Sequence, residues 1–396
     1  DLRNEEPRCG NGKRETAGAV PEECDGADLG AVSCEGLGFQ GGELHCSNDC
    51  KLPADTCLAS SPPSRVEPRA LEGDAAGLAL ARDGALVAVS SVHRGLELLR
   101  FDRKTLKPIG SKTTWTMPDG SGSAVSTPFV ASLDGGSSLI SVTRDGRTPE
   151  TLIFRVDGDG RIVETGVTVP GRALFLTAKG DRALLGTLSQ RTGNTLEAVV
   201  VDGQGKLLGT LKTMLTVSAT SGYVRGAAVA TPSGWFASLG TNGTFFTTTP
   251  FARIATDGRL IGSGALPVNG GQMAVARGPS SSFLVQTHPG GVLVTEISDA
   301  GVATRSRKLS SEPMSWMVAA TVEGRRLIAW ASDYAKLRRF ELELDGHEPT
   351  AATVIQVPMY IPIASLVVNG KLHHLFQMSP MPSRPMDRAF WMFSGR

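Results

Sequence analysis

The chain has 396 residues, more than the roughly 250–300 at which a single hydrophobic core stops growing. We therefore expect two domains, or one large all-β unit with an appendage. Hydrophobic residues make up 40% of the chain and charged residues 20%, which excludes a disordered protein. A net charge of +1 and a pI near 7.8 argue against a nucleic-acid partner. The sequence holds no run of about 18 apolar residues, so no transmembrane span is expected.

All six cysteines lie in the first 57 residues. Such a dense, even-numbered set in a segment with few large apolar residues predicts disulfides that replace a core, and a location outside the reducing cytosol. Six cysteines allow 15 pairings, which the sequence leaves open. A zinc site is the alternative, but Cys46 and Cys50 form the only closely spaced pair and His45 is the only nearby histidine. The predicted disulfide residues are Cys9, Cys24, Cys34, Cys46, Cys50 and Cys57.

Charge is divided unevenly along the chain. Residues 1–57 carry five Lys and Arg against 12 Asp and Glu, whereas the remainder carries 35 against 27. Two solvated surfaces that happen to differ would explain this, and so would an acidic module that docks onto a basic domain or a cationic partner. Both interpretations stay open.

The cysteine-rich segment also carries ordered motifs: Cys9-Gly10-Asn11-Gly12, then Glu22-Glu23-Cys24-Asp25-Gly26, then Leu37-Gly38-Phe39. Over residues 8–58 this order resembles the cysteine-rich repeat of secreted proteins and lipoproteins of myxobacteria. The resemblance implies export and often surface attachment, with a lipid anchor upstream of residue 1. Acidic side chains here could offer oxygen ligands to calcium, but an acidic turn held by disulfides is the simpler interpretation, and no metal is predicted.

From residue 65 onward, short β-type runs alternate with turns that contain glycine or aspartate. A first kind of turn occurs seven times at intervals of 44 to 54 residues, at Asp83-Gly84, Asp134-Gly135, Lys179-Gly180, Ser233-Gly234, Arg277-Gly278, Glu323-Gly324 and Asn369-Gly370. A second kind occurs six times, at Asp102, Asp157, Asp202, Asp257, Asp299 and Asp345. Four strands in about 45 residues is the repeat of a β-propeller blade.

We therefore predict an all-β fold: a seven-bladed β-propeller over residues 65–396, preceded by a disulfide-rich module at 1–58 and a linker at 59–64. In the first blade the strands are expected at Leu78–Leu80, Ala85–Val89, Leu96–Phe101 and Lys107–Thr114. The last blade lacks a fourth strand, because the chain stops just after Ala389–Phe393. Residues 65–72 are expected to supply that outer strand and close the ring, since an open blade would expose an unpaired edge.

The repeats resemble the seven-bladed, WD-like propeller superfamily in architecture only, because its Gly-His and Trp-Asp pairs are absent. A parallel β-helix is disfavoured, since its repeats are much shorter.

Motifs of enzymes and cofactor sites are missing from the sequence. It has no Gly-x-Ser-x-Gly elbow, no His-Glu-x-x-His and no phosphate loop. Asp157-Gly158-Asp159-Gly160 resembles the start of a calcium loop, but Thr168 stands at its twelfth position. His373 and His374 point to opposite faces of a strand, and a copper(I) site with the nearby methionines is less plausible than a Pro-rich loop with packing methionines. No cofactor is predicted.

One face of the predicted propeller collects rare bulky residues. We call it the loop face: it holds the turns between second and third strands and the connections from each fourth strand to the next blade. Aromatic and Arg side chains anchor interfaces and stack on sugars. The alternative is that some of them plug the loops of neighbouring blades. The predicted partner-binding residues are Trp115, Tyr223, Arg225, Phe245, Trp316 and Tyr334.

These features predict an exported, non-catalytic binding or scaffold protein of the cell envelope, at the cell surface or in the periplasm, whose loop face engages a protein or a polysaccharide. The alternative is a carbohydrate-active enzyme, a polysaccharide lyase or glycoside hydrolase, with its site in the propeller funnel. That enzyme would use His93 or His288 with Tyr223 or Tyr334. Its carboxylates would be Asp145 and Asp333, which lie in separate blades.

Overall fold

The computed structural model forms two compact units, one mainly of Asp1–Pro62 and one mainly of the residues from Pro63 onward. In the described part of the chain no helix has the length and hydropathy needed to cross a bilayer. The structure describes residues 9–14, 24–29, 41–48, 50, 57–58, 75–81, 83–92, 95–103, 105, 107–118, 126–157, 159–189, 195–216, 224–241, 248–267, 271–288, 290–312, 314, 316–332, 336–345, 350–356, 360–368, 371–378 and 390–395.

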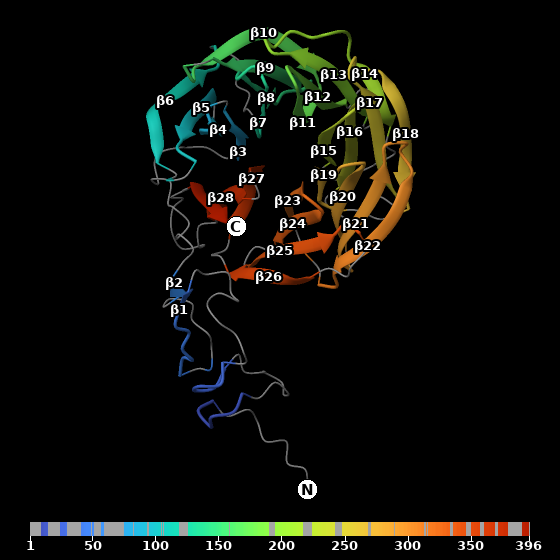
Figure 1. The fold of residues 1–396 in the computed structure, drawn as a ribbon. Coiled ribbons are helices and arrows are strands. Elements are labelled where there is room, and N and C mark those ends of the chain that lie inside the picture. Colours follow the sequence, from blue (N-terminus) through green and yellow to red (C-terminus); the bar gives the residue numbers. More distant parts are fainter. Residues whose placement is uncertain are drawn as a thin grey trace. The chain divides into compact units, whose positions relative to one another are not determined.

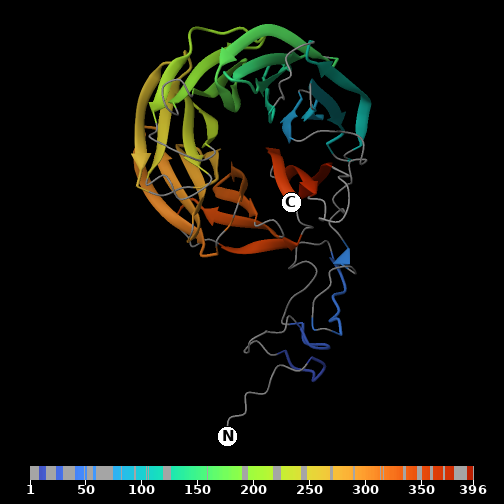
Figure 2. The same ribbon diagram turned by 180° about the vertical axis from the view of Figure 1, so that it is seen from behind.

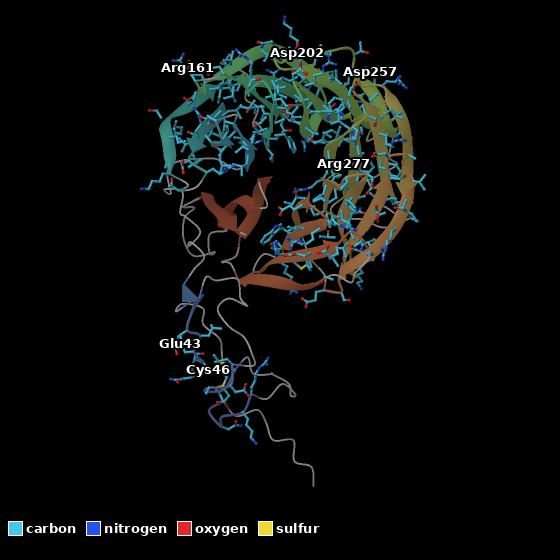
Figure 3. The ribbon with its side chains drawn as sticks, viewed as in Figure 1. Glu43, Cys46, Arg161, Asp202, Asp257 and Arg277 are labelled. Carbon is cyan, nitrogen blue, oxygen red and sulfur yellow. A yellow bond between two sulfur atoms is a disulfide. The ribbon has the colours of Figure 1, made fainter. Side chains whose placement is uncertain are left out.

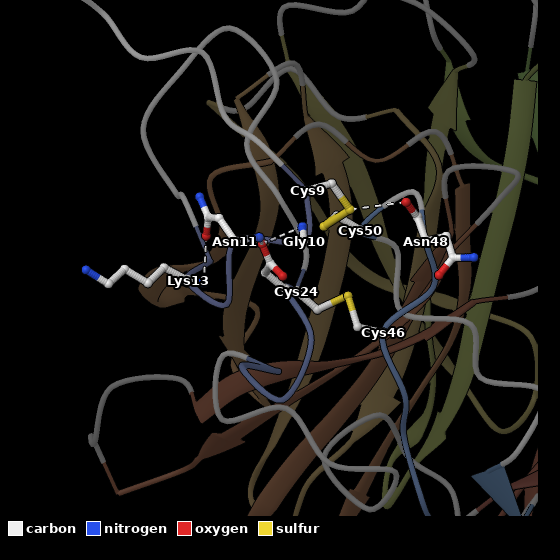
Figure 4. The surroundings of a disulfide bond; sticks show 9 residues. Cys9, Gly10, Asn11, Lys13, Cys24, Cys46, Asn48 and Cys50 are labelled. Carbon is white, nitrogen blue, oxygen red and sulfur yellow. Dashed lines mark hydrogen bonds between the residues drawn. A yellow bond between two sulfur atoms is a disulfide. The ribbon is translucent and has the colours of Figure 1, made fainter.

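The first unit is held by two disulfides, Cys9–Cys50 and Cys24–Cys46, with Cα atoms 5.5 and 5.7 Å apart (Figure 4). These two pairs confirm the predicted disulfide module in part. Cys34 lies outside the described residues, so the third disulfide stays a prediction. The short strands β1 (Gly41–Gly42) and β2 (Cys57–Leu58) pair with each other.

Asp25 has a structural role in this unit. Its side chain is buried, and Oδ2 accepts hydrogen bonds from the backbone N–H groups of Gly10 at 2.8 Å and Asn11 at 2.9 Å. Asp28 accepts a bond from the backbone N–H of Arg14. The acidic motif therefore fixes backbone turns, as a carboxylate does when it caps exposed N–H groups.

The second unit consists of antiparallel sheets whose strands follow one another in chain order (Figure 1). Among the described residues, six sheets have four strands and one has three. The first three sheets comprise β3 (Ala75–Leu80), β4 (Leu86–Val92), β5 (Gly95–Phe101) and β6 (Pro108–Thr116); β7 (Phe129–Ser132), β8 (Ser138–Arg144), β9 (Glu150–Val156) and β10 (Ile162–Pro170); and β11 (Arg172–Lys179), β12 (Arg182–Ser189), β13 (Thr195–Asp202) and β14 (Lys212–Thr216).

The next three comprise β15 (Val224–Thr231), β16 (Gly234–Thr241), β17 (Thr249–Ala255) and β18 (Leu260–Leu266); β19 (Met273–Arg277), β20 (Ser281–His288), β21 (Gly291–Ser298) and β22 (Ala303–Ser310); and β23 (Trp316–Glu323), β24 (Arg326–Ser332), β25 (Lys336–Glu343) and β26 (Thr350–Gln356). The three-stranded sheet comprises β27 (Tyr360–Val368), β28 (Lys371–Met378) and β29 (Phe390–Gly395).

The sheets of this unit stand in sequence around a centre, as Figures 1 and 2 show from opposite sides. The first strands β3, β7, β11, β15, β19, β23 and β27 each contact the first strand of the next sheet, and β27 contacts β3. This is the arrangement of a β-propeller, so the all-β prediction is confirmed. Residues 65–72, the predicted closing strand, lie outside the described residues.

Both kinds of predicted turn lie where the sequence placed them. Six of the seven first turns fall between the first and second strands of a sheet, and the seventh, Asn369-Gly370, lies outside the described residues. All six of the second kind fall at the end of a third strand or within two residues after it. The strand boundaries expected for the first blade differ from β3 to β6 by one to three residues at most ends.

The core lies between consecutive sheets. One buried cluster joins the first and second sheets through Val89, Leu98, Val142 and Phe154. Further clusters join the second to the third, the third to the fourth, the fourth to the fifth and the fifth to the sixth sheet. Central strands are buried on both faces, which explains their continuous apolar runs, whereas fourth strands such as β10 alternate between exposed and partly buried residues.

Glycines in the turns between third and fourth strands adopt a left-handed conformation that other residues rarely take. Gly160 and Gly205 have φ of 80° and 82°, and each donates its N–H to the carbonyl of the aspartate three residues before. A Cβ atom on Gly205 would collide with Thr165 of the preceding sheet. These turns therefore also dock against the neighbouring sheet. Figure 3 shows Asp202 and Asp257, from two such turns, at the outer edge of the ring, and Arg277 nearer its centre.

Candidate functional site

The predicted anchors are described only in part. Tyr223, Phe245 and Tyr334 lie outside the described residues, so their roles stay predictions. Trp316 is the first residue of β23, and its side chain is likewise outside the description. Trp115 and Arg225 belong to strands β6 and β15. The expectation that Trp115, Arg225 and Trp316 lie in loops is therefore wrong, although all three stand near the loop-face ends of their strands.

Trp115 fills the space between the first two sheets. Its side chain is half-buried, and its ring meets Phe154 of β9 edge-on with centroids 4.6 Å apart. Its indole N–H points to Glu164 of β10, with Nε1 and Oε2 3.4 Å apart. This is the packing role that the sequence left open as the alternative to partner binding.

Arg225 stands beside the start of the third sheet. A Cβ atom on its neighbour Gly226 would lie 3.0 Å from Leu174 Cβ in β11. Although Arg225 keeps solvent contact, desolvation by the surrounding protein atoms lowers the pKa of its guanidinium below its ordinary value. The group stays cationic at neutral pH because the ordinary pKa of a guanidinium is so high.

Two ion pairs fix further arginines at the same end of the sheets. Arg172, the first residue of β11, pairs with Asp145 through Nη2 and Oδ1 at 2.9 Å. Arg144, the last residue of β8, pairs with Glu150, the first residue of β9. Arg147 lies in the turn between them and is exposed. Arg172 could not be predicted from the sequence, because a strand residue directly after Gly171 carries no loop signal.

These groups can hold an anionic partner in place. A guanidinium positioned by a carboxylate keeps its remaining N–H groups available in a fixed plane, which suits carboxylates and phosphates. Of the residues named for the enzyme alternative, Asp145 is engaged with Arg172, whereas His93 and Asp333 lie outside the described residues, so that alternative stays a prediction. His288 is exposed, and its Nδ1 accepts a hydrogen bond from the backbone N–H of Gly290 at 2.9 Å.

No protein-family model and no curated protein matches the chain. The resemblance of residues 8–58 to the myxobacterial repeat therefore stays a prediction.

Solved structures share its fold. The β-propeller domain of Cps50 (Swd1) from Myceliophteria thermophila is 10% identical, with a TM-score of 0.51 over 82% of this chain and 98% of that one. The Dos1 propeller is 9% identical, with a TM-score of 0.50 over 80% and 76%. A candidate 6-phosphogluconolactonase from Bacteroides uniformis is 14% identical, with a TM-score of 0.52 over 72% and 87%. At such low identity these likenesses establish the β-propeller fold of the chain and leave its activity open.

Proposed function

We propose that this chain is an exported binding or scaffold protein of the cell envelope, and that the loop face of a seven-bladed propeller engages a protein or a polysaccharide. The two disulfides of the first unit support export, because such bonds persist in oxidising compartments. Residues 65–72 complete the last blade in this proposal.

The observation that carries the proposal is the arginine set of the loop face: Arg144, Arg147, Arg172 and Arg225. In this set four guanidinium groups stand against two paired carboxylates, Asp145 and Glu150. The excess positive charge favours a partner with carboxylate or other anionic groups, and charge of this kind steers association as well as strengthening it. The predicted aromatic anchors Tyr223, Phe245, Trp316 and Tyr334 would surround this set and supply the apolar part of the interface.

Capture from an envelope extract tests this proposal. Arg147→Glu should weaken capture by about tenfold or more, because it reverses an exposed charge that has no ion-pair partner among the described residues. Arg161→Glu is the matched control, since Arg161 is equally exposed but lies on the opposite face of the ring, in the turn before β10. A triple Tyr223→Ala, Trp316→Ala and Tyr334→Ala variant tests the aromatic anchors.

The proposal fails if Arg147→Glu and the folded triple variant both capture the same partners as the wild type. Loss of capture in Arg161→Glu alone would place the interface on the other face. The enzyme alternative is tested with the same preparations, by looking for new reducing ends or ultraviolet absorbance after incubation with acidic and neutral polysaccharides.

A further inference from the structure

A small hollow lies at the loop-face end of the fifth sheet. It has a volume of about 210 Å³ and is lined by His288 and Gly290 of the turn after β20, by Gly291, Val292 and Leu293 of β21, and by Lys308 of β22. A hollow of this size is below the usual range of drug-sized pockets, so its ligand is small, about one sugar ring.

Two glycines leave this space open. Gly291 has φ of 124°, and a Cβ atom there would collide with the carbonyl oxygen of Ser310 across the strand pair. Gly290 likewise brings no side chain between His288 and Lys308. Only backbone atoms of the Gly-Gly turn therefore line the hollow between the two basic side chains.

His288 and Lys308 project from the same face of the sheet. His288 pairs with Gly291 and Lys308 with Leu293, and residues two apart on β21 point to one side. A Cβ atom on Gly290 would lie 3.3 Å from His288 Nδ1 and 3.9 Å from Lys308 Nζ, which places both polar groups around one spot.

Both groups have hydrogen-bonding capacity to spare. Because His288 Nδ1 accepts the N–H of Gly290, the proton of the neutral ring stands on Nε2, which is then a donor. Lys308 is exposed and makes no ion pair or hydrogen bond within the described residues. Partly buried Leu293, on the same face of β21, supplies an apolar wall beside these donors.

We propose that this hollow binds one carboxylated sugar residue, a uronate, of an acidic polysaccharide. Its carboxylate meets the Lys308 ammonium, a ring or hydroxyl oxygen accepts from His288 Nε2, and the C–H face of the ring packs on Leu293. One rigid ring supplies all three contacts at a low entropic cost, whereas an acidic side chain supplies only the carboxylate. The inference rests on the proposed function in taking a polysaccharide as the partner of the loop face.

Titration of protein labelled with ¹⁵N at glycine tests this site directly, because the Gly290 and Gly291 amides line it. Glucuronate should shift these two signals saturably, while neutral glucose, acetate and N-acetylglutamate bind at least about tenfold more weakly. Lys308→Met should weaken glucuronate binding by about tenfold or more, and Lys308→Arg should largely restore it. Arg305→Gln on the same strand is the control and should bind as the wild type does.

Each contrary result has a defined meaning. Equal binding of glucuronate by Lys308→Met and the wild type overturns the site, and equal or tighter binding of acetate or N-acetylglutamate overturns the sugar assignment. If glucuronate fails to bind while Arg147→Glu still loses its envelope partner, the uronate site falls and the proposed function stands. If glucuronate binds while Arg147→Glu and the folded triple variant both capture normally, the site stands and the proposed role of the arginine set and the aromatic anchors falls.

Discussion

Thr143, near the end of β8, accepts a hydrogen bond of 2.8 Å from the backbone N–H of Ala173, near the start of β11 in the next sheet. Both residues are buried, so this bond fastens the second sheet to the third without competition from water. Other second strands also carry buried hydroxyl groups towards their loop-face ends, at Ser90, Ser91, Thr187, Ser238, Thr287 and Ser332.

Thr143→Val should therefore lower the free energy of unfolding by about 1–3 kcal/mol, because it keeps the shape of the side chain and leaves the Ala173 N–H buried without a partner. Thr143→Ser keeps the acceptor and should stay closer to the wild type. Urea unfolding of the three proteins measures the difference. A Val variant as stable as the wild type would mean that this bond contributes nothing to the join between the sheets.

Gly205→Ala should destabilise the protein more than Gly84→Ala. The backbone φ is 82° at Gly205 and 83° at Gly84, so an alanine costs about 1–2 kcal/mol of backbone strain at either position. A Cβ atom at Gly84 meets open space, whereas one at Gly205 collides with Thr165 of the preceding sheet. The difference between the two melting temperatures then reports the docking of the turn. Equal losses would show that the turn moves away from Thr165 without cost.

Trp115→Ala should lower stability by about 1–3 kcal/mol, less than for a fully buried ring, because it removes half-buried packing on Phe154 between two sheets. Trp115→Phe keeps an aromatic ring there and should recover part of that loss. Thermal unfolding and envelope capture are measured on the same samples. If Trp115→Ala keeps its melting temperature but loses capture, Trp115 is a partner-binding residue after all and its packing contact is incidental.

Removing residues 1–62 should leave a folded propeller, whereas removing residues 1–74 should not. The second deletion also takes the strand expected to cover the edge of the last sheet, and exposed edges invite aggregation. Melting temperature and the state of association, measured by light scattering, distinguish the two. Two truncated proteins of equal stability would rule out closure by residues 65–72.

Asp299 should contribute to the acid sensitivity of the fold. Arg277 donates to it through Nη1 at 2.5 Å and Nη2 at 3.0 Å, and this hydrogen bonding, aided by the cation's charge, holds the pKa of Asp299 below its ordinary 3.8. A lowered folded-state pKa means that the stabilisation is complete above about pH 4 and is lost as the pH falls through the folded value.

Because Asp299 is 45% exposed, the loss is at most about 1 kcal/mol. Asp299→Asn should flatten the decline in unfolding free energy as the pH falls below about 4, by that amount. An unchanged slope would show that solvent screens the pair completely.

The repeat could be predicted from the sequence because its signal is local. A turn such as Asp134-Gly135 needs residue types that strands avoid. Its position can therefore be predicted even where the ends of the flanking strands cannot. The docking role of glycines in the other turns could not be predicted, since Gly160 and Gly205 gain it only by meeting side chains of the preceding sheet. That contact depends on how sheets pack, which no single repeat encodes.

The loop face was harder to predict for a physical reason. Trp115 stands shortly before Pro118-Asp119-Gly120, residue types typical of a turn, so the sequence predicts that the strand ends before it, whereas β6 runs to Thr116. Arg172 and Lys308 also lie within strands. Arg172 meets Asp145 across two neighbouring sheets, and Lys308 of β22 meets the His288 turn across the intervening strand β21. A contact between two residues that lie apart in the sequence leaves no mark in the local amino-acid composition, so it could not be predicted.

Because each sheet packs mainly on its two neighbours, sequence changes in one sheet's loops have local structural effects. Strand hydrogen bonds run within each sheet, and each buried cluster joins only two consecutive sheets. A longer or recoded loop at the end of one sheet therefore disturbs at most its two neighbours and leaves the rest of the frame intact. Ligand preference can then change one sheet at a time, by exchange of single loops between homologues, while the buried frame stays constant.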